Sequence, residues 1–271
     1  MYNNNYNKKI VKLLFLQIKY KYYIKQGVEM ARKTIFISDL HLQEKQKEIT
    51  RSFFELLMNL DTSVDALYIL GDLFEIWVGD DDTTEFHCAI SQALYQTAQK
   101  GISIYFMHGN RDFLLGKRYL HNTGCQLLLD PTKMTIYGTQ ILLTHGDILC
   151  TRDVAYLKAR VVLRNRFIQI LFLLLPLVLR KKIAAYLREK SAKHTKSTMI
   201  EIMDVTQEEV EKVMINHSVS HLIHGHTHRP DIHHFVLNHI PATRIVLGAW
   251  HDHGHILIWD ENGKKELVKI K

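Results

Sequence analysis

Residues 224–228 read His224-Gly225-His226-Thr227-His228, and the rest of the chain is organised around this stretch. It follows an apolar pair at 222–223, so we predict a strand that ends where Gly225 begins a loop. In extended backbone, side chains two residues apart point the same way, which lets His226 and His228 reach one metal centre. The chain has 17 histidines, so this cluster alone is a weak signal and the prediction depends on partners elsewhere.

Four further predicted strands precede short polar segments. Apolar, β-rich runs occupy residues 34–38, 66–70, 102–107 and 140–144, and apolar residues at helical spacing lie at 46–60 and 84–100. The polar residues that follow these runs include Asp39, His41, Asp72, Asn110 and His145. A helix at 207–216 and strands near 243–248 and 255–259 complete the predicted domain. Strands that alternate with helices predict an α/β fold, in which the site forms at the strand ends.

The composition fits one large domain with an insertion, or at most two domains. Of the 271 residues, 46% are hydrophobic and 23% are charged, values typical of globular proteins with a packed core. The three cysteines show no C-x-x-C spacing. Their number and spacing argue for a reducing compartment and against both a disulfide framework and a thiolate zinc site.

The net charge of +7 lies entirely in the first 33 residues. Residues 1–33 contain eight basic side chains and one acid, so residues 34–271 are neutral overall. A neutral body argues against a general nucleic-acid binder. The leader has no signal-peptide cleavage site, and its apolar patch at 13–18 is too short to span a bilayer. It could be a basic amphipathic membrane anchor; we expect instead a disordered or untranslated extension, with translation starting at Met30.

Residues 151–200 interrupt the alternation with a helical, apolar and basic insertion. The most apolar run of the chain is the thirteen residues 167–179, which is too short for a transmembrane helix and contains Pro176. Residues 154–200 carry eleven basic side chains against one acid, Glu189. Such a segment suits an anionic membrane surface or an anionic lipid. The alternative is a buried helix with a basic, solvated face.

The side chains at the strand ends form a candidate metal set of oxygen and nitrogen donors without a thiolate. Its members are Asp39, His41, Asp72, Asn110, His145, His226 and His228. This chemistry suits Mn²⁺ and leaves Fe²⁺, Co²⁺ and Zn²⁺ open. Seven donors are too many for one catalytic ion with an open position, so we predict two ions about 3.5–4 Å apart, bridged by Asp72. Arg111 would offset negative charge that develops on a phosphate.

Five short motifs resemble the signature of the calcineurin-like metallophosphoesterases. They are Asp39-x-His41, Gly71-Asp72, Gly109-Asn110-Arg111-Asp112, His145-Gly146-Asp147 and Gly225-His226-x-His228. The resemblance implies a four-layer αββα sandwich and a dinuclear metal centre. It implies that one ion is held by Asp39, His41, Asp72 and His228. A second ion would be held by Asp72, Asn110, His145 and His226.

A closer resemblance, from about Thr34 to the C-terminal strands, is to the UDP-2,3-diacylglucosamine pyrophosphohydrolases of lipid A synthesis. It rests on Tyr68-Ile69-Leu70-Gly71-Asp72-Leu73-Phe74-Glu75, Trp77-x-Gly79-Asp80-Asp81-Asp82, His108-Gly109-Asn110-Arg111-Asp112-Phe113-Leu114-Leu115-Gly116-Lys117-Arg118 and Val246-Leu247-Gly248-Ala249-Trp250-His251. It implies that residues 151–200 form a helical lid whose apolar chamber holds acyl chains. Residues 34–150 and 201–271 would then form the metallophosphoesterase core.

The same resemblance implies catalytic and substrate-binding residues. Asn110 and Arg111 would be catalytic. The substrate contacts would be Asn110, Arg111, Asp153, Ser191 and His226, with Thr195 and Thr198 at two further lid positions. Thr195 and Thr198 depart from the family pattern, which has Asn and Lys there. Either Lys196 replaces that lysine or its contact is lost.

The activity implied by the resemblance is hydrolysis of the pyrophosphate bond of UDP-2,3-diacylglucosamine. Attack of water at the α-phosphorus would give UMP and 2,3-diacylglucosamine 1-phosphate (lipid X), an intermediate of lipid A and hence of lipopolysaccharide. We expect two Mn²⁺ ions per chain, a monomer and no nucleic-acid partner. The expected location is peripheral, on the anionic cytoplasmic face of the inner membrane of a Gram-negative bacterium.

Two alternatives stay open for the function. Another phosphoesterase, acting on soluble nucleotides or nucleic acid, would share the metal set but would not need the apolar run 167–179. A non-catalytic scaffold would share the fold, yet it would be expected to lose ligands or Arg111, and all are present. Glu75, Trp77 and Asp80–Asp82 could form an extra cation site; we favour a polar surface loop anchored by Trp77.

Overall fold

The structure is a computed structural model that describes residues 31–197, 202–251 and 253–270, with no side chains described for 194–197. The chain divides into two units, Met1–Arg32 and Lys33–Lys271. All elements described below belong to the second unit. The predicted extension before Met30 lies outside the described residues.

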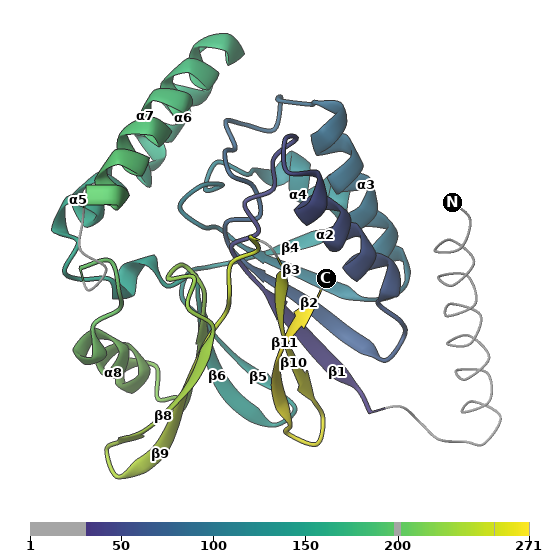
Figure 1. Cartoon of the computed structure of the whole chain (residues 1–271), viewed down its shortest axis with the longest axis vertical. Coiled ribbons are helices and arrows are strands. Elements are labelled where there is room, and N and C mark those ends of the chain that lie inside the picture. The colour runs from purple at the N-terminus through teal and green to yellow at the C-terminus, as the bar shows by residue number, and fades with distance from the viewer. Residues whose placement is uncertain (1–30, 198–201, 252, 271) are drawn as a thin grey trace, which may run out of the picture. The chain divides into compact units, whose positions relative to one another are not determined.

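One of the two β-sheets has six strands, four from the N-terminal half of the chain and two from its C-terminal end (Figure 1). Its strands are β1 (Lys33–Ile37), β2 (Val64–Leu70), β3 (Ser103–Met107), β4 (Cys125–Leu128), β10 (Gly254–Asp260) and β11 (Lys265–Ile270), in the order β11-β10-β1-β2-β3-β4. Strands β1 to β4 are parallel, whereas β10 and β11 add an antiparallel edge. The carboxyl ends of β1, β2 and β3 therefore share one edge of the sheet.

A five-stranded sheet packs against the first. Its strands are β5 (Thr132–Ile136), β6 (Thr139–Thr144), β7 (His221–His224), β8 (Asp231–Leu237) and β9 (Ile240–Val246), in the order β5-β6-β7-β9-β8. The central strands β6, β7 and β9 are parallel, and the two outer strands are antiparallel to their neighbours.

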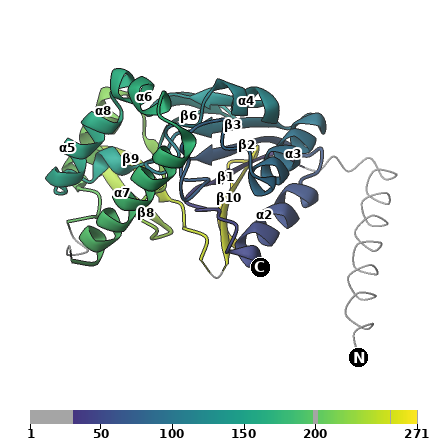
Figure 2. The same ribbon diagram turned by 90° about the horizontal axis from the view of Figure 1, so that it is seen from above.

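The alternation of side chains along the strands produces four layers. In β2, Leu67 and Ile69 pack in the cluster that includes residues of α2 (Lys47–Asn59), α3 (Glu85–Gln99) and α4 (Lys117–Thr123), whereas Tyr68 and Leu70 pack between the sheets. In β6, Leu142 packs with α8 (Gln207–Asn216). Figure 1 and Figure 2 show α2 to α4 on one sheet and α8 beside the other. The predicted αββα sandwich is confirmed.

The helix predicted at 84–100 shows how local signals set its ends. The Thr84 side chain accepts a hydrogen bond of 3.2 Å from the His87 N–H and so caps the first turn. Gly101 follows the helix with φ +86°, a left-handed conformation that glycine adopts without steric cost. In contrast, we did not predict the short elements α4, β4, β5, β8 and β11 individually, because four to seven residues give little periodic pattern.

The insertion is helical, as predicted, but its apolar side chains are not buried. It contains α5 (Val154–Leu163), α6 (Arg166–Leu173) and α7 (Leu177–Ser197), and the break between α6 and α7 falls at Pro176. No residue of α5 or α6 is buried. Large apolar side chains such as Phe167 (67% exposed) and Leu174 (76%) face solvent, so the buried-helix alternative is wrong. None of the described helices is long and apolar enough to cross a bilayer.

Candidate metal centre and substrate pocket

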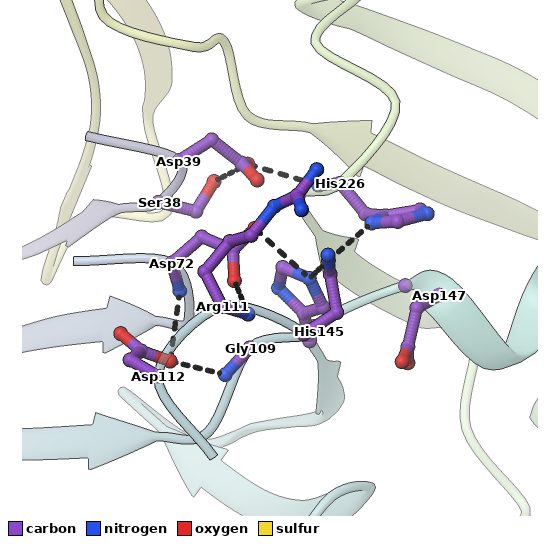
Figure 3. Close-up of polar contacts among 12 residues, drawn as sticks. Ser38, Asp39, Asp72, Gly109, Arg111, Asp112, His145, Asp147 and His226 are labelled. Carbon is purple, nitrogen blue, oxygen red and sulfur yellow. Dashed lines mark hydrogen bonds and ion pairs between the residues drawn. The ribbon is translucent and has the colours of Figure 1, made fainter. Parts of the chain in front are cut away.

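All seven predicted donor side chains lie just beyond the carboxyl ends of parallel strands. Asp39 and His41 follow β1, and Asp72 and Asn110 follow β2 and β3. The second sheet contributes His145 after β6 and both His226 and His228 after β7. Figure 3 shows Asp39, Asp72, His145 and His226 converging from these strand ends. The structure therefore brings together residues that are up to 189 positions apart in the sequence.

One group of donors consists of Asp39, His41, Asp72 and His228. The Nε2 atom of His228 lies 3.4 Å from Asp39 Oδ1 and 3.3 Å from His41 Nε2. The Nε2 atom of His41 is in turn 3.8 Å from Asp72 Oδ2. Asp39 Oδ1 is buried and has no hydrogen-bond partner among the described residues. A buried carboxylate oxygen that faces only potential ligands is the environment expected around a cation.

A second group consists of Asp72, Asn110, His145 and His226. One amide atom of Asn110 lies 3.0 Å from His145 Nε2, 3.1 Å from His226 Nδ1 and 3.1 Å from Asp72 Oδ2. If the Asn110 amide nitrogen faces the site, it can donate hydrogen bonds to these histidine and carboxylate atoms. If the amide oxygen faces the site instead, all four side chains direct acceptor atoms to one point, as a metal ion requires. Asp72 Oδ2 belongs to both groups, since it is also 3.9 Å from His145 Nε2. The Asp39 carboxylate also lies within 4.8 Å of donor atoms of Asp72 and His145, so the bridging role of Asp72 stays a prediction.

The backbone at the ligand positions is strained. Five of the seven donors have positive φ angles, namely Asp39 (54°), His41 (50°), Asp72 (54°), His226 (69°) and His228 (60°). Non-glycine residues rarely adopt this conformation, and it costs of the order of 1 kcal/mol or more at each position. Strain of this kind persists where the surrounding structure holds side chains in one functional orientation.

Two glycines allow the loops to approach so closely. A Cβ atom on Gly109 would overlap the Asp72 carboxylate, and one on Gly225 would overlap the side chains of Asp39 and Ser38. Ser38 donates a 2.6 Å hydrogen bond to Asp39 Oδ2, which also accepts one of 2.9 Å from the His226 N–H. The glycines of the Gly-Asn and Gly-His motifs are thus required for packing against the carboxylates.

The fully buried Asp112 fixes the loops that carry Asp72 and Asn110. Its carboxylate accepts hydrogen bonds from the N–H groups of Leu73 (2.7 Å) and Gly109 (2.8 Å). Figure 3 shows the contact with Gly109. Burial and the charge of nearby Asp72 raise the pKa of Asp112 to about 6. Asp112 is therefore a positioning residue of the Gly-Asn-Arg-Asp motif, a role that its sequence context alone did not reveal.

The electrostatics of the centre favour a positive charge. Burial lowers the pKa of His145, but the charges of Asp72, Asp39 and Asp147 outweigh it and raise that pKa to about 9. Burial raises the pKa of Asp39, yet His228, His145 and His41 hold it well below the usual range. Ring Nδ1 of His145 faces the Leu70 carbonyl at 2.9 Å, so Nδ1 carries a proton and Nε2 points to the site. The donor set fits divalent metal ions.

One cavity joins this centre to the helical insertion. Its lining includes the predicted substrate contacts Asn110, Arg111, Asp153, Ser191 and His226. Asp153 also caps α5, because its carboxylate accepts a 3.0 Å hydrogen bond from the Tyr156 N–H. Of the two remaining predictions, Thr195 lies in α7 with no side chain described, and Thr198 lies outside the described residues. Neither position is tested, and the same holds for Lys196.

Sequence reasoning missed several residues of this cavity. They are Cys150, Tyr156, Met203, Asp204, Thr227 and Arg229. Thr227 and Arg229 flank His228 directly, which was a signal that could have found them. In contrast, no pattern marked Asp204, whose carboxylate pairs with Arg229 at 2.6 Å.

The acidic loop 80–82 is structural, as we favoured. Asp80 accepts hydrogen bonds from the Trp77 indole N–H (3.1 Å) and from the backbone of Gly116 and Tyr119 at the start of α4. Asp81 pairs with Arg180 and Asp82 pairs with Lys181, both at the start of α7. The carboxylates are therefore committed to other parts of the chain and do not form a separate cation cluster.

The sequence of the chain matches the calcineurin-like phosphoesterase family over residues 32–230. Curated relatives match over most of their length. "UDP-2,3-diacylglucosamine hydrolase" of Pseudomonas entomophila (strain L48) is 51% identical over 84% of this chain and 95% of that protein. The protein of the same name from Enterobacter sp. (strain 638) is 48% identical over 88% of this chain and 98% of that protein.

The chain belongs to the calcineurin-like phosphoesterases, a class of metal-dependent hydrolases with the fold and donor set described above. Within that class it belongs to the family of the UDP-2,3-diacylglucosamine hydrolases, to which its curated relatives at about half identity belong. The family resemblance seen in the sequence motifs is confirmed.

Proposed function

We propose that this chain hydrolyses the pyrophosphate bond of UDP-2,3-diacylglucosamine in lipid A synthesis. Water would attack the α-phosphorus, giving UMP and 2,3-diacylglucosamine 1-phosphate. The observation that carries the proposal is the cavity that joins the metal-donor cluster to Ser191 of α7. That helix belongs to an insertion whose large apolar side chains are exposed. An enzyme that acts on a soluble nucleotide would need the cavity at the metal donors but not the exposed apolar side chains.

The apolar insertion is the part of the molecule suited to acyl chains. Of the 22 exposed large apolar side chains among the described residues, 14 lie between Val154 and Leu187. An exposed apolar surface of this density marks a binding site for lipid or protein rather than an ordinary solvated face. We therefore propose that residues 151–200 form a lid that holds the two acyl chains of the substrate.

The residues of the chain would act on the pyrophosphate as follows. Asp39, His41, Asp72 and His228 would hold one Mn²⁺ ion, and Asp72, Asn110, His145 and His226 would hold a second. When bound, such ions supply the Lewis acidity that activates water and offsets charge on phosphoryl oxygens. Arg111 lines the cavity together with Asn110, and its guanidinium would stabilise the negative charge that grows on the phosphoryl oxygens.

The substrate-positioning roles would fall on both sides of the cavity. Asp153 and Ser191 come from the insertion, whereas Asn110 and His226 come from the core. Binding the glucosamine phosphate between them would place the reacting phosphorus near the metal donors. Orientation of this kind accounts for a large share of the rate in displacements at phosphorus.

The test is a reaction of the purified protein with Mn²⁺ and UDP-2,3-diacylglucosamine in ¹⁸O-labelled water, which is quenched by removing the metal and then read by phosphorus NMR. The proposal predicts label in the phosphate of UMP and none in 2,3-diacylglucosamine 1-phosphate. Turnover of a generic phosphodiester with none of the lipid nucleotide would keep the phosphoesterase and refute the lipid substrate. Label in the lipid product would refute attack at the α-phosphorus. Repeating the assay with Mg²⁺, Co²⁺ and Zn²⁺ tests the preference for Mn²⁺.

We also propose that the chain works as a monomer bound peripherally to the anionic, cytoplasmic face of the inner membrane. The exposed apolar residues and the basic side chains of 154–200 support this location. Flotation with vesicles that contain phosphatidylglycerol should recover the protein, and flotation with neutral vesicles should recover less. The double variant Phe167→Ser/Leu174→Ser should reduce flotation. Met58→Ser, which removes an exposed apolar side chain from α2 outside the insertion, should not. Light scattering after gel filtration tests the monomer.

A further inference from the structure

The carboxylate of Glu75 lies between a candidate metal ligand and the helical insertion. Its Oε2 is 2.9 Å from His41 Nδ1, and its Oε1 forms an ion pair with Arg188 Nε in α7. The side chains of Glu75 and His41 are 14% and 13% exposed, so both are largely removed from solvent. One acidic group thus contacts a residue 34 positions earlier in the chain and another 113 positions later.

The backbone holds Glu75 beside the loop that carries His41. The Glu75 N–H donates a 3.2 Å hydrogen bond to the Leu42 carbonyl, and the His41 N–H donates one of 2.9 Å to the Asp72 carbonyl. Leu42 and Phe74 form a parallel β-bridge between the two loops. Because both loops are tied together, a change at the Glu75 carboxylate is transmitted to the His41 ring rather than absorbed by loop motion.

The contact with His41 has a definite chemical effect. A carboxylate at Nδ1 favours the tautomer with the proton on Nδ1, which leaves the Nε2 lone pair for a metal ion. That Nε2 atom already faces His228 Nε2 at 3.3 Å and Asp72 Oδ2 at 3.8 Å. The ring N–H is not aligned on the Glu75 oxygen, and contacts of this kind commonly tighten when a site is loaded.

The contact with Arg188 connects this pair to the substrate side of the cavity. Arg188 is three residues before Ser191, so the two side chains lie on neighbouring positions of one face of α7. Ser191 lines the cavity. Two further ion pairs between α7 and the core, made by Arg180 and Lys181, reach Asp81 and Asp82 and not a candidate metal ligand. The Arg188–Glu75 pair therefore links α7, through Glu75, to His41 of the donor cluster.

We propose that Glu75 is a positioning residue that couples the order of helix α7 to metal binding at His41. Metal binding would fix the His41 ring and the Glu75 carboxylate, which in turn holds Arg188 and α7 against the core. By reciprocity, fixing α7 would strengthen metal binding at the same site. The inference rests on the proposed metal centre but not on the proposed lipid substrate.

The first experiment measures Mn²⁺ binding by the free-ion EPR signal, without lipid. Glu75→Gln keeps the shape of the side chain but removes its charge, and it should weaken binding at one site by about 10–100-fold. Glu75→Asp, which retains the charge, should restore part of the affinity. Lys193→Gln removes an exposed pair with Glu189 on the same helix and should leave the affinity unchanged.

The second experiment measures hydrogen exchange of α7 with and without Mn²⁺. In the wild-type protein and in Lys193→Gln, Mn²⁺ should slow exchange across α7. In Arg188→Gln, which leaves the His41 contact in place, that protection should disappear. Equal protection in Arg188→Gln and the wild type would refute the coupling, and so would wild-type Mn²⁺ affinity in folded Glu75→Gln. Absence of Mn²⁺ binding by the wild type would refute the metal centre together with the coupling. Failure of lipid hydrolysis alone would refute only the substrate, because neither readout contains lipid.

Discussion

Tyr156 donates a 2.5 Å hydrogen bond from its hydroxyl group to the buried carboxylate of Asp147. The same oxygen accepts a 2.7 Å hydrogen bond from Arg160 Nε, one turn further along α5. Asp147 belongs to the loop that carries His145, so these contacts tie the insertion to the metal-donor cluster. Burial and the charge of Asp147 raise the pKa of Tyr156 well above its usual range, which keeps the hydroxyl protonated as a donor.

Replacing Tyr156 by Phe should lower the free energy of unfolding by about 1–2 kcal/mol, because one hydrogen bond to a buried carboxylate is lost. The ring, which lies 5.9 Å from the His226 ring, would be kept. Urea denaturation measures the change. Tyr95→Phe on the exposed face of α3 is the matched control and should change stability by less than about 0.5 kcal/mol. If both substitutions lowered the free energy of unfolding equally, the hydrogen bond to Asp147 would not be a specific source of stability.

Replacing Asp72 by Ala should abolish turnover and the loading of both metal ions. Asp72 Oδ2 lies within 4 Å of donor atoms in both groups, so its loss leaves neither group complete. Metal content by plasma mass spectrometry after dialysis measures the loss. Glu208→Ala, at the exposed start of α8, should bind metal like the wild type. Two tightly bound ions in Asp72→Ala would contradict the bridging role.

Replacing Arg111 by Ala should reduce kcat/KM by about 10²–10³-fold while the metal ions stay bound. The Arg111 contact with Asp72 is made by its backbone N–H, at 2.8 Å, and alanine retains that group. Steady-state kinetics and metal content are measured on the same preparation. Arg111→Lys keeps the positive charge but loses the planar guanidinium. Its kcat/KM should lie between the values of the wild type and Arg111→Ala. Metal loss in Arg111→Ala would refute the role assigned to its side chain.

Replacing Arg180 by Ala should loosen the start of α7 and lower the free energy of unfolding by about 1–3 kcal/mol. Its guanidinium is 3% exposed, pairs with Asp81, and donates to the carbonyls of Val78 (2.5 Å) and Leu175 (3.0 Å). Limited proteolysis and urea denaturation measure both effects, with Lys193→Ala as the control. Resistance of α6 and α7 to protease at the wild-type level would contradict this anchoring.

The contribution of the Arg180–Asp81 pair should depend on pH in acid. The hydrogen bond from Arg180 lowers the pKa of Asp81 below its ordinary value of 3.8. The stabilisation is therefore present above pH 3.8 and is lost as the pH falls through the lower, folded-state pKa. The difference in unfolding free energy between the wild type and Arg180→Ala should shrink below pH 3.8. A difference that stays constant down to pH 2 would contradict the assignment.

The positions of the donor cluster could be predicted from the sequence because each depends on local information. A strand-forming run followed within three residues by Asp39, Asn110 or His145 places a polar group at a strand end, wherever the strand lies in its sheet. Parallel strands then bring those ends to one edge by topology. The extended backbone predicted through His226 and His228 was wrong: both residues have positive φ angles, and their side chains belong to the two different donor groups. The left-handed backbone at five donors carried no such signal, since the surrounding packing imposes it.

Contacts between distant segments were decided only by the tertiary structure. A uniformly apolar run has no periodic pattern that distinguishes a buried face from an exposed one. The sequence therefore did not predict that Phe167 and Leu174 are exposed, and the tertiary structure shows that they are. The partners of Asp80–Asp82 and the link from Glu75 to His41 and Arg188 likewise lie far along the chain. A carboxylate in a sequence is equally suited to bind a cation, cap a helix or pair with arginine. Only the folded arrangement determines which positive group reaches it.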